Sequence, residues 1–140
     1  MYSHTQVGWI ILIVLVGALV AVGAAATGQG AALIALVLLV LMFPLLGSLT
    51  VTVDEEAVTA KFGIGLIRKS IAIKDIQSAT PVRNKWYYGW GIRMGPGGWM
   101  YNVSGLDAVE IAMKNGGKFR IGTDEAEELA RAISIVTSNT

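Results

Sequence analysis

The chain contains no cysteine and only one histidine, His4, among its 140 residues. Without cysteine it has no disulfides, no thiolate nucleophile and no zinc–cysteine site. Nucleophilic triads and histidine zinc sites need imidazoles at defined positions, and His4 lies outside the region where we expect a folded domain. We therefore expect a protein that is not an enzyme, with no cofactor and no metal site.

Charged side chains are absent from Val7 to Gly47, and all 21 of them lie from Asp54 onward. The formal net charge is +1, which is not the strong basic excess typical of nucleic-acid binding, so we expect no nucleic-acid partner. The charge-free segment accounts for the high hydrophobic fraction of 54%. The composition therefore divides the chain into an apolar N-terminal part and a mixed C-terminal part.

The apolar part consists of two continuous runs, Val7 to Ala26 and Ala31 to Leu46, separated by Thr27-Gly28-Gln29-Gly30. A helix over the first run would be about 30 Å long, the thickness of a bilayer's hydrocarbon core. The glycines allow the chain to reverse, and Pro44 bends or stops the second helix. The pattern predicts a transmembrane two-helix hairpin over residues 7–47, after an N-terminal tail (1–6) and before a small domain (49–140).

Two other interpretations of the apolar runs are weaker. A cleaved signal peptide is suggested by the small residues Ala24-Ala25-Ala26, but the first six residues lack the positive charge of an n-region. Two core helices of a soluble protein would need a far larger body to cover them. The hairpin is therefore the favoured interpretation.

Orientation is predicted from Lys and Arg near the ends of the hairpin. The N-terminus and the inter-helix turn have none, whereas Lys61, Arg68, Lys69 and Lys74 follow the second run. The charge pattern predicts an integral plasma-membrane protein with two spans and both termini in the cytoplasm.

Small residues share one face of the first predicted helix. Gly17, Ala21 and Ala24 recur at i, i+4 and i+7, and such a face lets two helices approach closely. We expect it to pack on Ala31 and Ala35 of the second helix. Packing between two copies of the chain is the alternative.

After Gly47 the pattern changes to the alternation that is typical of strands. It predicts seven or eight short antiparallel strands, the last two with Val109, Ile111, Phe119 and Ile121 facing inward. Thr123 is expected to cap a final helix. The apolar stripe by which this helix is expected to pack over one end of the sheet consists of Ala126, Leu129, Ala130 and Ile133.

Three local patterns accompany this order of elements: Gly89-Trp90-Gly91-Ile92-Arg93, Trp99-x-Tyr101-Asn102-Val103-Ser104-Gly105, and Gly122-Thr123-Asp124. Together they resemble the bacterial pleckstrin-homology-like domains that often lie beside membrane helices. The resemblance covers roughly residues 49–136 and implies a strongly bent antiparallel sheet, nearly a barrel, capped by the C-terminal helix. It implies binding functions more than catalysis. The phosphoinositide-binding pattern of the family is incomplete here, so that site is not transferred.

An aromatic stretch between basic residues is the main candidate for a functional site. Its rings are either packed in the sheet core, or in contact with anionic lipid headgroups or a protein partner. The candidate contact residues are Arg83, Lys85, Trp86, Tyr87, Tyr88, Trp90 and Arg93.

The sequence therefore predicts a membrane-anchored, non-enzymatic binding or scaffold module with a pleckstrin-homology-like domain at the cytoplasmic membrane surface. Its expected partners are the lipid bilayer with its anionic headgroups, and a protein partner or a second copy. The alternative is an accessory subunit of a membrane complex, or a homo-oligomer, that acts through its transmembrane hairpin.

Overall fold

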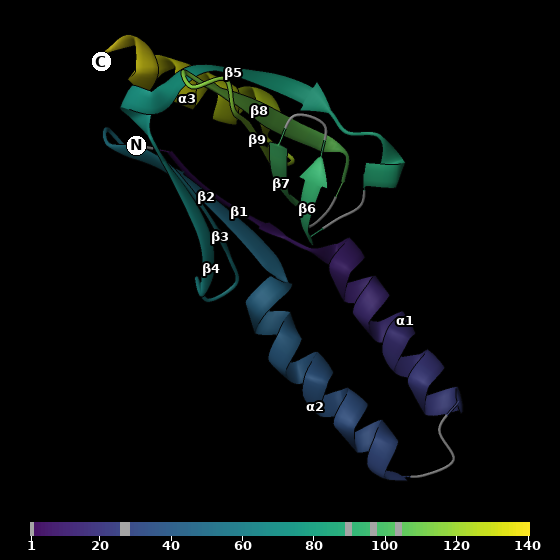
Figure 1. Ribbon diagram of the computed structural model, residues 1–140. Coiled ribbons are helices and arrows are strands. Elements are labelled where there is room, and N and C mark those ends of the chain that lie inside the picture. The colour runs from purple at the N-terminus through teal and green to yellow at the C-terminus, as the bar shows by residue number, and fades with distance from the viewer. Residues whose placement is uncertain (1, 26–28, 89–90, 96–97, 103–104) are drawn as a thin grey trace.

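The computed structural model describes residues 2–25, 29–88, 91–95, 98–102 and 105–140. Within these residues, nine strands form two sheets and three α-helices accompany them (Figure 1). Two of the helices extend away from the sheets as a pair, and the third packs against the second sheet. The two sheets and this third helix are called the β domain below.

The first sheet has four antiparallel strands in the order β1-β2-β3-β4. Its strands are β1 (Tyr2–Val7), β2 (Ser48–Val53), β3 (Ala57–Phe62) and β4 (Ile67–Ala72). Side chains alternate along β2 and β3, with every second residue buried, as the predicted alternation requires. One face of this sheet therefore belongs to the core.

The second sheet has five strands in the order β5-β8-β9-β7-β6. Its strands are β5 (Ile76–Arg83), β6 (Gly91–Gly95), β7 (Gly98–Asn102), β8 (Asp107–Met113) and β9 (Lys118–Gly122). β7 pairs with β9 in parallel, whereas the other pairs are antiparallel. The prediction of seven or eight antiparallel strands is corrected to nine described strands with one parallel pair.

The core lies between the two sheets and under α3 (Ala126–Ser138). Leu129, Ala130 and Ile133 are buried, which confirms the predicted stripe of the last helix. The helix begins at Ala126 with Glu125 in the cap position, so Thr123 is not its cap; the Thr123 hydroxyl accepts a hydrogen bond from the Glu125 N–H in the turn before the helix.

The paired helices are α1 (Trp9–Ala25) and α2 (Gln29–Leu46). Among the described residues, neither helix combines the length and the apolar character that a membrane span requires. The predicted transmembrane hairpin is therefore wrong. So are the membrane part of the predicted fold class and the localisation as a two-span plasma-membrane protein with cytoplasmic termini.

The physical reason is visible at the ends of the helices. Val7 belongs to β1, and Gly8 is buried at the junction with the second helix, where its N–H donates to the Gly47 carbonyl at 2.6 Å. The sequence predicts a helix over the twenty residues from Val7 to Ala26, whereas the described helix α1 has 17. That length corresponds to about 26 Å, less than the roughly 30 Å of a hydrocarbon core.

The N-terminal residues form a strand where the sequence suggested a tail. β1 pairs with β2 from Tyr2 to Val7 and reaches the start of α3. The Tyr2 hydroxyl donates to Glu125 Oε2 at 2.8 Å, and His4 Nε2 lies 2.6 Å from Asp124 Oδ1. The strand was missed because the segment Tyr-Ser-His-Thr-Gln-Val has no apolar alternation to reveal it.

The helix pair is attached to the β domain by close backbone contacts. The N–H of Ile64, in the β3–β4 turn, donates to the Pro44 carbonyl near the end of α2 at 3.0 Å. Gly63 adopts φ +49°, and a Cβ at this position would overlap the Pro44 carbonyl. The turn therefore satisfies one of the carbonyls that every helix end leaves unpaired.

Candidate binding surface

The aromatic stretch begins where β5 ends and is fixed to the outer face of the second sheet by Asn84. Asn84 is 3% exposed, and its backbone N–H donates to the Leu106 carbonyl at 2.6 Å. Its Oδ1 accepts a hydrogen bond from Arg120 Nη1 at 3.0 Å. Asn84 therefore anchors the start of the segment that contains the rings.

Arg120 connects this anchor to the sheet. On the outer face of β8 and β9, Arg120 Nε and Nη2 lie 3.0 and 2.9 Å from Glu110 Oε2, and Lys118 Nζ lies 3.4 Å from Glu110 Oε1. Burial alone would raise the pKa of Glu110, but the hydrogen bond and charge of Arg120 hold that pKa below its ordinary value. The carboxylate is therefore stabilised in its charged form.

Three rings follow in the short 3-10 turn η2 (Trp86–Tyr88). Trp86 and Tyr87 pack edge to face with centroids 5.7 Å apart, and Tyr87 and Tyr88 do so at 5.2 Å. The Arg120 guanidinium lies 5.9 Å from the centroid of the Tyr88 ring, so the same arginine supports both Asn84 and the last ring. This packing fixes the rings in an edge-to-face row.

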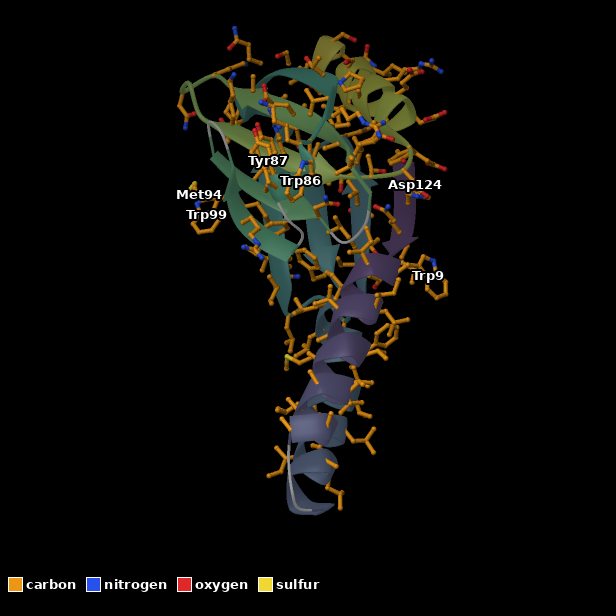
Figure 2. All side chains as sticks on the ribbon, turned by 90° about the vertical axis from the view of Figure 1, so that its right-hand side faces the viewer. Trp9, Trp86, Tyr87, Met94, Trp99 and Asp124 are labelled. Carbon is orange, nitrogen blue, oxygen red and sulfur yellow. The ribbon has the colours of Figure 1, made fainter. Side chains whose placement is uncertain are left out.

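Trp86 and Tyr87 are 74% and 59% exposed. These fractions exclude burial in the sheet core, which the sequence left open. Lys85 Nζ lies 5.7 Å from the centroid of the Tyr87 ring, and hydrogen bonding to Tyr87 raises the pKa of Lys85. Lys85, Trp86 and Tyr87 are called the aromatic surface below; Figure 2 shows Trp86 and Tyr87 together on the face of the second sheet.

The other predicted contact residues do not belong to the aromatic surface. Arg83 is exposed and pairs with Asp107 at 3.4 Å, so its charge is partly compensated. Arg93 is exposed on β6. Trp90 lies outside the described residues. The structure therefore brings Lys85, Trp86 and Tyr87 into one surface, whereas Arg83 and Arg93 lie on the two opposite edge strands of the second sheet, β5 and β6.

The small-residue face of α1 does not form the contact between the helices. Gly17, Ala21 and Ala24 are exposed, and a Cβ added at Gly17 would meet no atom within 4 Å. Ala35 of α2 is half-buried, and the side chain of Ala31 lies outside the described part of the chain. The residues that line the groove between the helices are Leu15, Ala18, Leu19, Val22, Ala35, Leu38, Leu39 and Met42.

Sequence reasoning missed Asn84, Glu110 and Arg120 as supports of the surface. The alternation that predicts Ile111 and Phe119 to face inward places Glu110 and Arg120 on the outer face, and the register pairs these two residues directly. Their connection to Asn84 has no sequence signal, because 36 positions separate Asn84 from Arg120. Within the described residues, no group of acidic or histidine side chains is arranged to hold a metal ion.

Comparison of the chain with protein-family models, with curated proteins and with solved structures finds no match. The pleckstrin-homology-like resemblance therefore stays a prediction.

Proposed function

We propose that this protein is a non-enzymatic binding module whose β domain holds a protein partner through the aromatic surface. The observation on which this depends is the exposure of Trp86 and Tyr87, which are packed against each other yet lie in solvent. Tryptophan and tyrosine are the side chains most enriched among residues that dominate protein–protein binding. Two sheets closed by a C-terminal helix are also compatible with the resemblance to a fold that serves mainly in binding.

The support beneath the rings strengthens this proposal. Asn84 and Arg120 hold the segment before a partner arrives, so binding costs little conformational entropy. Lys85 adds a positive charge at the edge of the rings. The partner that fits this surface presents an apolar pocket for the Trp86 indole with an acidic group beside it.

The test uses the full-length protein with a photo-crosslinking amino acid at Arg83, beside the aromatic surface. We expect one discrete crosslinked partner in cells, and Trp86→Ala should remove it, because truncating such an anchor typically weakens binding about thirtyfold or more. Glu127→Ala, on the exposed side of α3, is the matched control and should keep the crosslink. An adduct that survives Trp86→Ala would contradict the proposal.

A second candidate function, self-association through the helix pair, is favoured by a separate observation. Fourteen large apolar side chains of α1 and α2 are each 39–69% exposed, whereas monomeric proteins rarely expose apolar patches of more than a few hundred Å². These residues are Trp9, Ile13, Val14, Val16, Val20, Val22, Leu33, Ile34, Leu36, Val37, Leu38, Val40, Leu41 and Phe43.

A second copy is the occupant that the surface favours. Residues 7–47 contain no charged side chain that could orient a different protein on this surface. Two copies of the same apolar face, in contrast, match each other in an isologous dimer. Covering a half-exposed side chain of this kind is worth about 1 kcal/mol. Covering most of them on both copies is worth on the order of 20 kcal/mol, more than the roughly 4–15 kcal/mol lost on association.

Sedimentation of the purified full-length protein tests this candidate. We expect a dimer or larger oligomer, and Leu36→Glu, which places a charge in the apolar face, should shift it toward the monomer. Ile135→Glu, at an exposed apolar position of α3, should leave the oligomer intact. A monomeric wild-type protein, or equal effects of the two variants, would contradict self-association through the helices.

A further inference from the structure

A cleft opens on the side where the two sheets are not joined. Both sheets end there in an edge strand, β4 in the first and β6 in the second. The cleft has a volume of about 250 Å³, slightly below the range of pockets that hold drug-sized ligands, about 300–1,000 Å³. Its size therefore suits a small molecule of one or two rings. Its lining residues are Lys69, Ile92, Trp99, Tyr101 and Phe119.

The strand register explains why this cleft is apolar. Ile92 lies opposite Tyr101 in the β6–β7 pair, and Trp99 lies beside Phe119 in the parallel β7–β9 pair. Phe119 is buried in the core, so these residues share the inward face of the sheet. The cleft is therefore an open extension of the core.

Packed rings form the base of the cleft. Tyr101 contacts Phe119 with centroids 5.0 Å apart at 70°, and it contacts Phe62 at 5.1 Å. Above them Trp99 and Ile92 are 53% and 38% exposed. Figure 2 shows Trp99 at the margin of the domain, next to Met94 and apart from Trp86 and Tyr87.

Lys69 adds a positive charge to this apolar cleft. It lies opposite the buried Ala60 and between Ile67 and Ile71 on β4, so alternation places it on the inward face of the first sheet. Among the described residues, no carboxylate forms an ion pair with Lys69. An inward lysine on an edge strand also discourages pairing with other chains, but that role does not require an aromatic cleft beneath it.

We propose that this cleft binds a small aromatic carboxylate, with the ring between Trp99 and Ile92 and the carboxylate on Lys69 Nζ. The apolar lining and the exposed indole suit a flat ring, which loses less conformational entropy on binding than an alkyl chain does. Among the described residues, Lys69 is the one charged side chain that lines the cleft, so charge complementarity selects an anion. The site does not depend on the aromatic surface, since Phe119 faces inward whereas Arg120 beneath Tyr88 faces outward.

The experiment titrates the full-length protein with phenylacetate and, in parallel, with its neutral counterpart phenylacetamide. Binding is followed by calorimetry and by the chemical shift of the Trp99 indole N–H. We expect phenylacetate to bind with a dissociation constant of about 1 mM or lower, as a ligand of this size allows. Phenylacetamide should bind about fivefold to tenfold more weakly.

Two variants on the same strand locate the anion. Lys69→Gln should weaken phenylacetate about fivefold to tenfold and remove the preference over phenylacetamide. Arg68→Gln is the matched control, because Arg68 lies on the opposite face of β4, and it should bind as the wild type does. Equal binding of the two compounds to the wild type, equal effects of the two variants, or tighter binding of octanoate would each overturn the proposal.

Discussion

Replacing Arg120 with methionine tests how the aromatic surface is supported. Methionine keeps much of the apolar length of the side chain but removes the guanidinium. Glu110 then loses its contacts at 2.9 and 3.0 Å and retains only Lys118 at 3.4 Å. Asn84 Oδ1 loses the hydrogen bond from Arg120. The Asn84 Nδ2 group already has no acceptor among the described residues, so the buried amide would have both polar ends unpaired.

The size of the effect follows from burial. Removing one partner of a fully buried ion pair costs about 3–5 kcal/mol. Arg120 and Glu110 are 16% and 18% exposed, and Lys118 still compensates part of the Glu110 charge. We therefore expect the loss of the Arg120–Glu110 pair to lower the free energy of unfolding by about 2 kcal/mol. The lost hydrogen bond to Asn84 adds about 1 kcal/mol. A total near 3 kcal/mol should lower the Tm by roughly 10–20 °C in a domain of this size.

Thermal and urea unfolding of the full-length protein, followed by circular dichroism, measures this loss. Arg83→Met is the control, because its 3.4 Å pair with Asp107 is exposed on both sides and should contribute less than about 1 kcal/mol. Similar losses in the two variants would refute the assigned role of Arg120.

The pH dependence of stability is an independent test of the contacts between Arg120 and Glu110. The pKa of Glu110 is lower in the folded protein than its ordinary value of 4.5. Its stabilisation is therefore fully present above about pH 4.5 and is lost as the pH falls through the folded-state pKa. The stability difference between wild type and Arg120→Met should narrow over that window. A difference that stays constant on acidification would show that Glu110 does not mediate the effect.

Three further predictions concern the fold. Leu129→Ala should cost about 2–5 kcal/mol in urea unfolding, whereas Glu127→Ala should change stability by less than about 0.5 kcal/mol; equal losses would mean that α3 is not held by its apolar stripe. Gly63→Ala should lower the Tm more than Gly116→Ala, because both have positive φ but only a Cβ at Gly63 meets the carbonyl near the end of α2. Burial and the hydrogen bond to the Glu125 carboxylate raise the pKa of the Tyr2 hydroxyl. The stability that this hydroxyl contributes to the fold is therefore lost only at strongly alkaline pH. Tyr2→Phe should cost about 1 kcal/mol at neutral pH in urea unfolding, and no loss would show that β1 is not fixed by this bond.

Much of the β domain was predictable because local pattern and burial agree. Val109 and Ile111 were predicted to face inward from alternation alone, and both are fully buried. The stripe of the last helix was predicted in the same way. An apolar period of two residues in a strand, or of 3.6 residues in a helix, indicates which face of the element is buried. This pattern can be recognised in the sequence of the element alone.

The apolar N-terminal part was predicted less well for a related reason. The sequence shows that residues 7–47 are apolar and uncharged, but this pattern does not indicate at which residue the helix begins. The hydrogen bond between Gly8 and Gly47 and the pairing of β1 with β2 take the first residues of the run out of the helix. β1 itself is held by pairing with a strand more than forty residues away, which no local pattern shows.

The sequence by itself determined most of the elements: two apolar helices, the alternating strands after Gly47, and a final amphipathic helix with its buried stripe. Only the tertiary structure decided that Trp86 and Tyr87 lie in solvent, because their exposure depends on how Asn84 and Arg120 fix the turn to the sheet. It also decided that Lys69 faces the rings of Trp99 and its neighbours. These juxtapositions arise between strands that are distant in the chain, and a residue's own neighbours in sequence contain no information about them.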